Sequence, residues 1–211
     1  MHHDAGPVEF SLRGAAHRVK LISMGTGVTV RKARPADAES VARVYVESWR
    51  DTYPLVLPAR VLNGMTIRGQ AARWRNAISV GVREAVLVAE DEKGRLIGMT
   101  SMGRARDAGI GYDAEIYTLY VDPLMTGRGA GRALLAGAFS ALAERGHTRC
   151  IVWAHAGNPA RFFYEAMGGK AIAERTTSMM GVPVPEVAFG WARLALPERG
   201  NRKSEAGTGK P

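Results

Sequence analysis

The spacing of hydrophobic residues predicts strands and helices in alternation through the middle of the chain. Residues 28–31 alternate apolar and polar side chains, which is typical of a strand. Pro35-Ala36-Asp37 has the composition of a helix start, and the apolar residues after it lie three and four positions apart. A second helical pattern covers about 67–78. The first part of the chain is therefore expected to form one strand followed by two helices.

Three further strands and a helix are expected next. The apolar runs 85–89 and 96–100 flank the polar turn 91–94, which ends in glycine, so we expect an antiparallel hairpin. A strand over 114–121 follows. Residues 129–144 then place apolar side chains on one helical side and stop at a glycine, which predicts a helix.

In the last third of the chain, the hydrophobic pattern predicts a strand over 151–154, a short helix over 159–167, and two strands near 170–180 and 185–195. The expected order is β, α, α, β, β, β, α, β, α, β, β, with no internal repeat. Elements mixed in this way indicate a single α/β (α+β) domain over 27–196, since 211 residues suffice for one core.

Both ends of the chain lack a sustained period. We expect residues 1–26 to be a flexible N-terminal extension, with Met24 as an alternative start, and 197–211 to be a disordered tail. The chain begins without the apolar core of a secretory signal, and no apolar run reaches the roughly 18 residues of a membrane span. The sequence therefore predicts a cytoplasmic protein that does not bind membranes.

Charge and cysteine usage narrow the function classes. The net charge of +9 is dispersed, without a dense basic run or interleaved aromatic residues, so nucleic acid is not expected as a partner. A local binding site for a small phosphorylated ligand explains part of the positive charge equally well. Cys150 is the single cysteine and lies in an apolar run, which favours a buried thiol over a nucleophile.

A glycine-rich segment joins the strand over 114–121 to the next helix. It reads Thr126-Gly127-Arg128-Gly129-Ala130-Gly131-Arg132. The first turn of a helix carries unpaired N–H groups and the positive end of the helix dipole, and glycines let a ligand approach the backbone. Arg128 and Arg132 add positive charge. The segment therefore predicts a diphosphate site, although a helix start without a ligand is the alternative.

The sequence does not match the common phosphate-binding and hydrolase motifs. The segment lacks the third glycine of the dinucleotide fingerprint, and no Gly-Lys-Ser/Thr follows to form a P-loop. The chain also contains no G-x-S-x-G elbow, no H-E-x-x-H and no recognisable cysteine–histidine pattern, which argues against a hydrolase.

Two blocks of the sequence resemble the GNAT superfamily of acyl-CoA N-acyltransferases. Leu119-Tyr120-Val121-Asp122-Pro123 followed by residues 126–135 is similar to the central motif of the family, with Thr126 where Gln or Arg is usual. Asn158-Pro159-Ala160-Arg161-Phe162-Phe163-Tyr164-Glu165 resembles the next block. The resemblance covers about 28–195 and is strongest over 114–169. The Trp49-Arg50-x-Thr52-Tyr53 stretch also occurs in relatives that include uncharacterised small-molecule N-acetyltransferases.

The resemblance implies the GNAT fold, with a mixed, mostly antiparallel sheet of six to seven strands flanked by about four helices. It also implies that acetyl-CoA lies in a V-shaped gap between the strands at 114–121 and 149–154, with no metal. Backbone groups of Leu119 and Val121 pair with the pantetheine arm in this scheme. The residues expected to bind the coenzyme are Leu119, Tyr120, Val121, Thr126, Gly127, Arg128, Gly129, Ala130, Gly131, Arg132, Asn158 and Phe163.

The family's chemistry implies direct attack of a primary amine on the acetyl thioester in a ternary complex. Tyr164 matches the position of the acid that protonates the leaving thiolate, and Glu115 matches the base, acting directly or through water. Simple alternation puts Glu115 on the face of Leu119 and Val121, and a bulge in the strand, which the sequence does not show, decides its direction. A packed aromatic and an exposed strand-end carboxylate are the alternatives, and His155 is a further candidate for proton transfer.

The remaining expectations concern the acceptor and assembly. The early helices and the loop 104–114 are expected to face the acceptor, with Asp51 or Asp113 binding a cationic amine. Asn158 is also a candidate N-cap. The sequence does not decide whether the acceptor is an amino acid, a polyamine, an antibiotic, a peptide N-terminus or a protein lysine. A homodimer is expected by analogy. The alternative function is a catalytically inert acyl-CoA-binding module.

Overall fold

A computed structural model describes residues 27–54, 56–81, 84–179 and 181–195. The expected N-terminal extension and C-terminal tail lie outside these residues. The strands are β1 (Thr29–Lys32), β2 (Glu84–Glu90), β3 (Leu96–Arg104), β4 (Ala114–Val121), β5 (Cys150–His155), β6 (Lys170–Met179) and β7 (Val182–Trp191). The helices are α1 (Ala38–Thr52), α2 (Ala59–Gly64), α3 (Ile67–Val80), α4 (Ala130–Ala143) and α5 (Ala160–Ala166). Short 3-10 turns lie at Pro35–Asp37, Ala108–Ile110 and Pro123–Met125.

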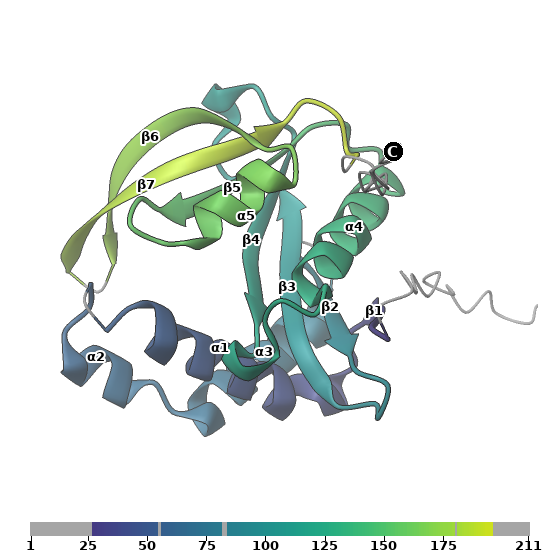
Figure 1. Cartoon of the computed structure of the whole chain (residues 1–211), viewed down its shortest axis with the longest axis vertical. Coiled ribbons are helices and arrows are strands. Elements are labelled where there is room, and N and C mark those ends of the chain that lie inside the picture. The colour runs from purple at the N-terminus through teal and green to yellow at the C-terminus, as the bar shows by residue number, and fades with distance from the viewer. Residues whose placement is uncertain (1–26, 55, 82–83, 180, 196–211) are drawn as a thin grey trace, which may run out of the picture.

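The strands form one seven-stranded sheet in the order β1-β2-β3-β4-β5-β7-β6 (Figure 1). Within the described residues, neighbouring strands pair antiparallel except β4 and β5, which pair parallel. The expected hairpin is present, because Asp91 Oδ1 accepts the N–H groups of Lys93 and Arg95 and Gly94 adopts a φ of 72° in the turn. The mixed sheet confirms the predicted fold class.

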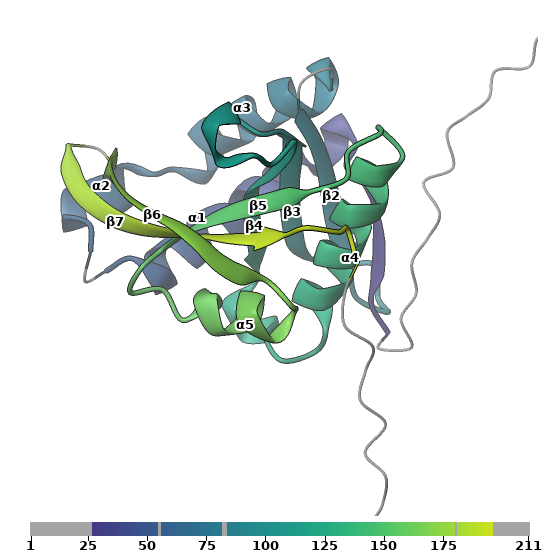
Figure 2. The same ribbon diagram turned by 90° about the horizontal axis from the view of Figure 1, so that it is seen from above.

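Helices cover both faces of the central strands (Figures 1 and 2). Alternate residues of β2 point to opposite cores: Leu87 packs with α4, whereas Val86 and Val88 pack with α1 and α3. This explains why β2 reads as a continuous apolar run, since a strand buried on both faces has no polar side. The helix α5 lies on the same side as α4, where Tyr164 joins the larger core.

The β6–β7 hairpin reaches across to the segment that follows α1. Met179 and Val182 at its tip pack on a small cluster formed by Tyr53, Leu57 and Leu62. In Figure 1 the same two regions, far apart in sequence, lie side by side at the end of the molecule near α2. The sequence did not predict α2, because its six residues are too few to show a helical period and they end in Asn63-Gly64.

Candidate functional site

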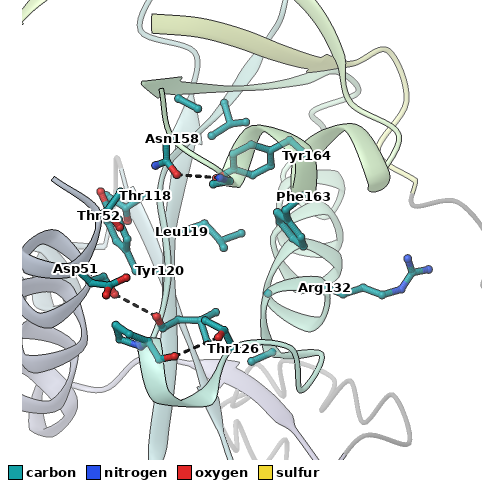
Figure 3. A pocket seen from close by; sticks show the side chains of 18 of the residues that line it. Asp51, Thr52, Thr118, Leu119, Tyr120, Thr126, Arg132, Asn158, Phe163 and Tyr164 are labelled. Carbon is teal, nitrogen blue, oxygen red and sulfur yellow. Dashed lines mark hydrogen bonds between the residues drawn. The ribbon is translucent and has the colours of Figure 1, made fainter. Parts of the chain in front are cut away.

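The strands β4 and β5 pair over three positions and then separate. Ala114 lies beside Cys150, and the last pair joins Ile116 to Val152. Beyond this pair a cavity of about 460 Å³ opens, within the range of ligand sites (Figure 3). Its walls come from β4, β5, the loop before α4, the start of α5 and the end of α1. The V-shaped gap expected from the sequence is therefore present.

The edge of β4 that faces this gap carries backbone groups without a strand partner. The N–H of Asp122 donates to the carbonyl of Ile97 on β3 at 2.8 Å. Because backbone groups alternate in direction along a strand, those of Val121 and Leu119 face away from β3 and toward the gap. The hydroxyl of Ser48 donates to the Val121 carbonyl at 3.2 Å, so that oxygen already has a protein partner.

Most of the glycine-rich loop borders the cavity. Its lining residues are Thr126, Gly127, Gly129, Ala130, Gly131 and Arg132. Gly127 and Gly129 have φ values of 76° and 86°, a left-handed conformation that glycine adopts without strain. The hydroxyl of Thr126 donates to the carbonyl of Pro123 at 3.1 Å, so it stabilises the preceding turn. The loop therefore presents mainly backbone to the cavity.

The two arginines of the loop do not direct their charge into the cavity. Arg128 is exposed and does not line it. Arg132 borders it, but its guanidinium donates to the sulfur of Met167 at 3.4 Å, and its side chain points away from the cavity in Figure 3. The positive end of α4 and the loop N–H groups thus supply most of the local attraction for an anion.

Asn158, Phe163 and Tyr164 reach the cavity from the α5 side (Figure 3). Asn158 Oδ1 accepts the N–H of Ala160 at 2.8 Å, so Asn158 caps the helix as expected. Phe163 packs on the start of α4, where a Cβ added to Gly131 would lie 3.4 Å from its ring. The short helix therefore places three of the predicted side chains on one wall.

Tyr164 is 5% exposed and stands among aromatic rings of Phe163, Phe189 and Trp191. Its hydroxyl has no hydrogen-bond partner among the described residues, although the side chain lines the cavity. Burial raises the pKa of Tyr164 well above its usual range, and the nearby Tyr53 adds to the shift. The phenol therefore stays protonated in alkaline solution.

A bulge in β4 lies at the point where β4 and β5 separate. Ser101 of β3 pairs with Thr118, whereas Met102 pairs with Ile116, so Tyr117 is the extra residue. The bulge reverses the direction of every side chain on one side of it relative to simple alternation. It coincides with the last positions of the β4–β5 ladder.

The bulge sends Glu115 to the face opposite Leu119. Ile116 belongs to the core that Leu119 packs against, so Glu115 points toward α1 and α3. Its carboxylate is buried and accepts from Arg106: Nε and the backbone N–H each lie at 3.0 Å, and Nη2 also contacts Oε1. The guanidinium of Arg106 stacks on Tyr117 at 4.7 Å. Glu115 lines neither cavity, and both of its oxygens are engaged.

A second cavity of about 410 Å³ lies on that opposite face of β4. Five residues border both cavities and mark where they meet: Tyr53, Tyr117, Thr118, Tyr120 and Trp153. The other residues that line the second cavity are Tyr45, Trp49, Arg73, Trp74, Glu84, Arg106, His155, Met179 and Glu186. Its wall is largely aromatic, with charged groups of both signs.

The other predicted site residues are distributed differently. Asp51 borders the first cavity at the end of α1. Asp113 borders neither, and its carboxylate accepts the N–H groups of Thr148 and Arg149 at 2.9 Å. His155 lines the second cavity, but its Nδ1 accepts the N–H of Gly157 at 2.9 Å. The neutral imidazole then carries its proton on Nε2 and has no free lone pair to act as a base.

Several lining residues were outside the sequence predictions. The expected acceptor-facing parts do contribute, since α1, α3 and Arg106 of the loop 104–114 all border the second cavity. The sequence did not point to Glu84 and Glu186, because each is a single charged residue within a strand and belongs to no recognisable motif. Tyr120 was expected to bind the coenzyme, yet it borders both cavities. In the described part of the chain, no cluster of three or more His, Cys, Asp or Glu forms a metal site, and no helix is long and apolar enough to cross a membrane.

The chain is similar to known proteins in sequence and in fold. The chain is 37% identical over 168 residues, covering 80% of this chain and 95% of the relative, to the uncharacterised N-acetyltransferase YuaI of Bacillus subtilis (strain 168). Among solved structures, yncA of Salmonella typhimurium, a putative acetyltransferase with acetyl-CoA, aligns with a TM-score of 0.60 at 21% identity, covering 83% and 99% of the two chains. PaiA N-acetyltransferase of Thermoplasma acidophilum, in complex with coenzyme A, aligns with a TM-score of 0.57 at 22% identity, covering 76% and 97%.

The sequence model of the family described as "Acetyltransferase (GNAT) family" matches residues 43–169. This range begins within α1, includes the glycine-rich loop and ends shortly after α5. This range contains both sequence blocks that resembled the family, and the YuaI similarity extends across most of the chain. The protein is a member of the GNAT family of acetyltransferases.

Proposed function

We propose that the protein transfers the acetyl group of acetyl-CoA to a primary amine by direct attack in a ternary complex. The observation that carries this proposal is the separation of β4 from β5 directly over the start of α4. An unpaired strand edge matches the amides of a pantetheine arm, and the glycine loop matches a diphosphate. Both features border one cavity.

The residues present fit the coenzyme. Backbone groups of Leu119 and Val121 bind the pantetheine arm, and the Val121 carbonyl keeps one lone pair beside its bond from Ser48. The loop from Thr126 to Arg132 holds the diphosphate mainly through N–H groups, and Asn158 and Phe163 form the opposite wall. When bound, acetyl-CoA supplies an activated acyl group as a thioester. Arg128 contributes charge from outside the cavity rather than a contact.

The acceptor enters through the second cavity, which meets the first at Tyr53, Thr118 and Tyr120. The amine nitrogen forms the new C–N bond as the C–S bond breaks. Tyr164 donates its phenolic proton to the leaving sulfur. The proton lost by nitrogen passes to a carboxylate of the second cavity, Glu84 or Glu186, since Glu115 is buried and fully hydrogen-bonded. No covalent enzyme intermediate is needed.

Calorimetric titration with acetyl-CoA and thiol release across an amine panel test the proposal. Wild-type protein is expected to bind acetyl-CoA and to release thiol with at least one amine. Absence of acetyl-CoA binding contradicts the proposal. Binding without turnover of any amine favours the inert acyl-CoA-binding module. A cytoplasmic location and a homodimer stay predictions, which cell fractionation and size-exclusion chromatography check.

A further inference from the structure

Four charged side chains line the second cavity, Arg73, Glu84, Arg106 and Glu186. Arg106 pairs with Glu115, and Glu186 pairs with Arg175, whose Nε lies 2.7 Å from Oε2. Arg73 and Glu84 also line the cavity, and neither forms an ion pair among the described residues. The lining therefore carries two cations and two anions, because Glu115 and Arg175, the partners of Arg106 and Glu186, lie outside it. This balance fits a dipolar ligand.

Arg106 is held in a fixed orientation at the cavity wall. Three of its N–H groups donate to the buried carboxylate of Glu115, and its plane stacks on Tyr117. Its side chain is nevertheless 62% exposed, so Nη1 remains open to a ligand. A guanidinium fixed in this way loses little side-chain entropy when it binds a carboxylate. Glu115 is therefore a positioning residue for Arg106.

A second stacked arginine–carboxylate pair contributes Glu186 and Trp153 to the lining of the same cavity. Arg175 stacks on Trp153 at 3.8 Å and holds the carboxylate of Glu186 through Oε2. Oε1 of Glu186 has no hydrogen-bond partner among the described residues, and Glu84 adds a second carboxylate. These acceptors suit an ammonium group. The cavity thus carries fixed donors for an anion and fixed acceptors for a cation.

The size and walls of the cavity limit the acceptor further. A volume of about 410 Å³ lies near the lower end of small-molecule sites. The rest of the lining consists largely of aromatic rings, together with Met179. Such walls favour an apolar or aromatic body over a sugar or a polyamine.

We propose, on the basis of the acetyltransferase function above, that the acceptor is a small amino acid-type amine with an apolar or aromatic side chain. Arg106, supported by Arg73, binds its carboxylate. Glu84 and Glu186 receive its amino group next to the point where the two cavities meet. The class includes free α-amino acids and close analogues, and it excludes polyamines and lysine side chains of folded proteins.

The first test needs no variant. The kcat/KM values for L-phenylalanine, L-leucine and L-methionine are compared with those for phenethylamine, 3-methylbutylamine and 3-(methylthio)propylamine, which lack only the carboxylate. At least one amino acid is expected to exceed its decarboxylated partner by about 10- to 100-fold, the effect of a charged hydrogen bond. Binding of the same pairs to the protein saturated with coenzyme A is measured by calorimetry as a readout independent of turnover.

The second test removes the guanidinium. Arg106→Gln is expected to bring the ratio of kcat/KM for the amino acid to kcat/KM for its decarboxylated amine down to about one. Arg104→Gln is the matched control, because Arg104 lies two residues away and does not line the cavity. Arg106→Gln leaves Glu115 buried without its partner, so the double variant Arg106→Gln/Glu115→Gln and the single variant Arg73→Gln are measured as well. Arg73→Gln is expected to reduce the preference in the same direction.

Three results overturn the inference. The first is that amines without a carboxylate have kcat/KM values equal to those of the matching amino acids. The second is that Arg106→Gln and Arg73→Gln both keep the wild-type preference for the carboxylate. The third is that no amino acid binds or reacts. In each of these cases acetyl-CoA binding and thiol release with another amine leave the proposed function intact. Loss of acetyl-CoA binding by wild-type protein instead contradicts the proposed function itself, and with it this inference.

Discussion

At the scale of single residues, burial and pairing determine which groups are available for chemistry. Tyr164 and Glu115 are both nearly excluded from solvent. Tyr164 keeps a hydroxyl without a partner at the cavity, whereas Glu115 uses both oxygens on Arg106. The two residues therefore have different roles despite similar burial: Tyr164 can donate a proton, and Glu115 fixes a neighbour.

Replacing Tyr164 tests its role as the acid. We expect Tyr164→Phe to lower kcat about 100-fold, the lower range for loss of a general acid, with little change in the KM for acetyl-CoA. Steady-state kinetics by thiol release measures both values. Tyr112→Phe is the control, because Tyr112 lines neither cavity. An unchanged kcat in Tyr164→Phe removes Tyr164 from the mechanism.

The pH dependence of the rate provides a second check on Tyr164. An acid catalyst must be protonated to act, and burial raises the pKa of this phenol above its ordinary value of about 10. We therefore expect kcat to rise with pH as the amine loses its proton and to show no alkaline decline below pH about 10. A decline centred near pH 8 or 9 identifies a different acid.

The role of Glu115 is open to the same kind of measurement. Loss of a general base lowers kcat by about 10²- to 10⁴-fold and removes the acidic limb of the pH profile. We expect Glu115→Gln to keep kcat within about threefold of wild type and to leave the shape of the profile unchanged, since Gln still accepts from Arg106. A large loss of kcat with a shifted profile assigns the base to Glu115 after all.

At the scale of secondary-structure elements, the site depends on two irregularities. The bulge at Tyr117 lies where the β4–β5 ladder ends, and it sends Glu115 to the face of the second cavity. The left-handed residues Gly127 and Gly129 set the backbone of the loop before α4. Regular helices and strands surround these points, so the irregular backbone lies where it borders a cavity rather than in the core.

A pair of glycine substitutions separates the stability of the loop from its function. Gly127 and Gly94 have φ values of 76° and 72°, and an added Cβ meets no atom within 4 Å at either position. Alanine at either site is expected to cost about 1 kcal/mol from the backbone conformation alone. Only Gly127→Ala is expected to raise the Kd for acetyl-CoA, by about tenfold or less. Chemical denaturation and calorimetry measure the two effects, and equal Kd values in both variants contradict a coenzyme role for the loop.

At the scale of the whole molecule, the sheet and three separate regions enclose the site. The segment after α1, the tip of the β6–β7 hairpin and α5 meet around the open end of β4. Tyrosines gather there: Tyr45, Tyr53, Tyr120 and Tyr164 border one or both cavities. Burial raises the pKa of each, to about 12 for Tyr45.

These tyrosines predict a loss of stability in alkaline solution. Each has a higher pKa when folded than its value of about 10 when unfolded, so the folded state holds protons that the unfolded state releases. Their contribution is complete below pH 10 and is lost above it, by about 1.4 kcal/mol per pH unit for each tyrosine that stays protonated. Urea unfolding at pH 8 and pH 11 measures this. Tyr45→Phe is expected to show a shallower decline, and an identical slope contradicts the assignment.

Local sequence information determined the order of elements and most of the coenzyme site. Apolar periods predicted the strands and four of the helices because these elements are amphipathic or continuously apolar. The glycine loop was recognisable because the requirement for left-handed residues before a helix restricts the sequence itself. Asn158, Phe163 and Tyr164 were predicted together because one short helix presents them, and the structure places all three on the same cavity.

Only the tertiary structure decided the acceptor side. The direction of Glu115 depends on a bulge, and a single extra residue reverses side-chain direction without any signal in the local pattern. The pairing of Arg106 with Glu115 and of Arg175 with Glu186 joins residues from different strands and loops, so no local period encodes it. The sequence by itself thus determined the fold and the glycine-rich loop of the proposed coenzyme site, whereas long-range packing determined which charged groups line the proposed acceptor cavity.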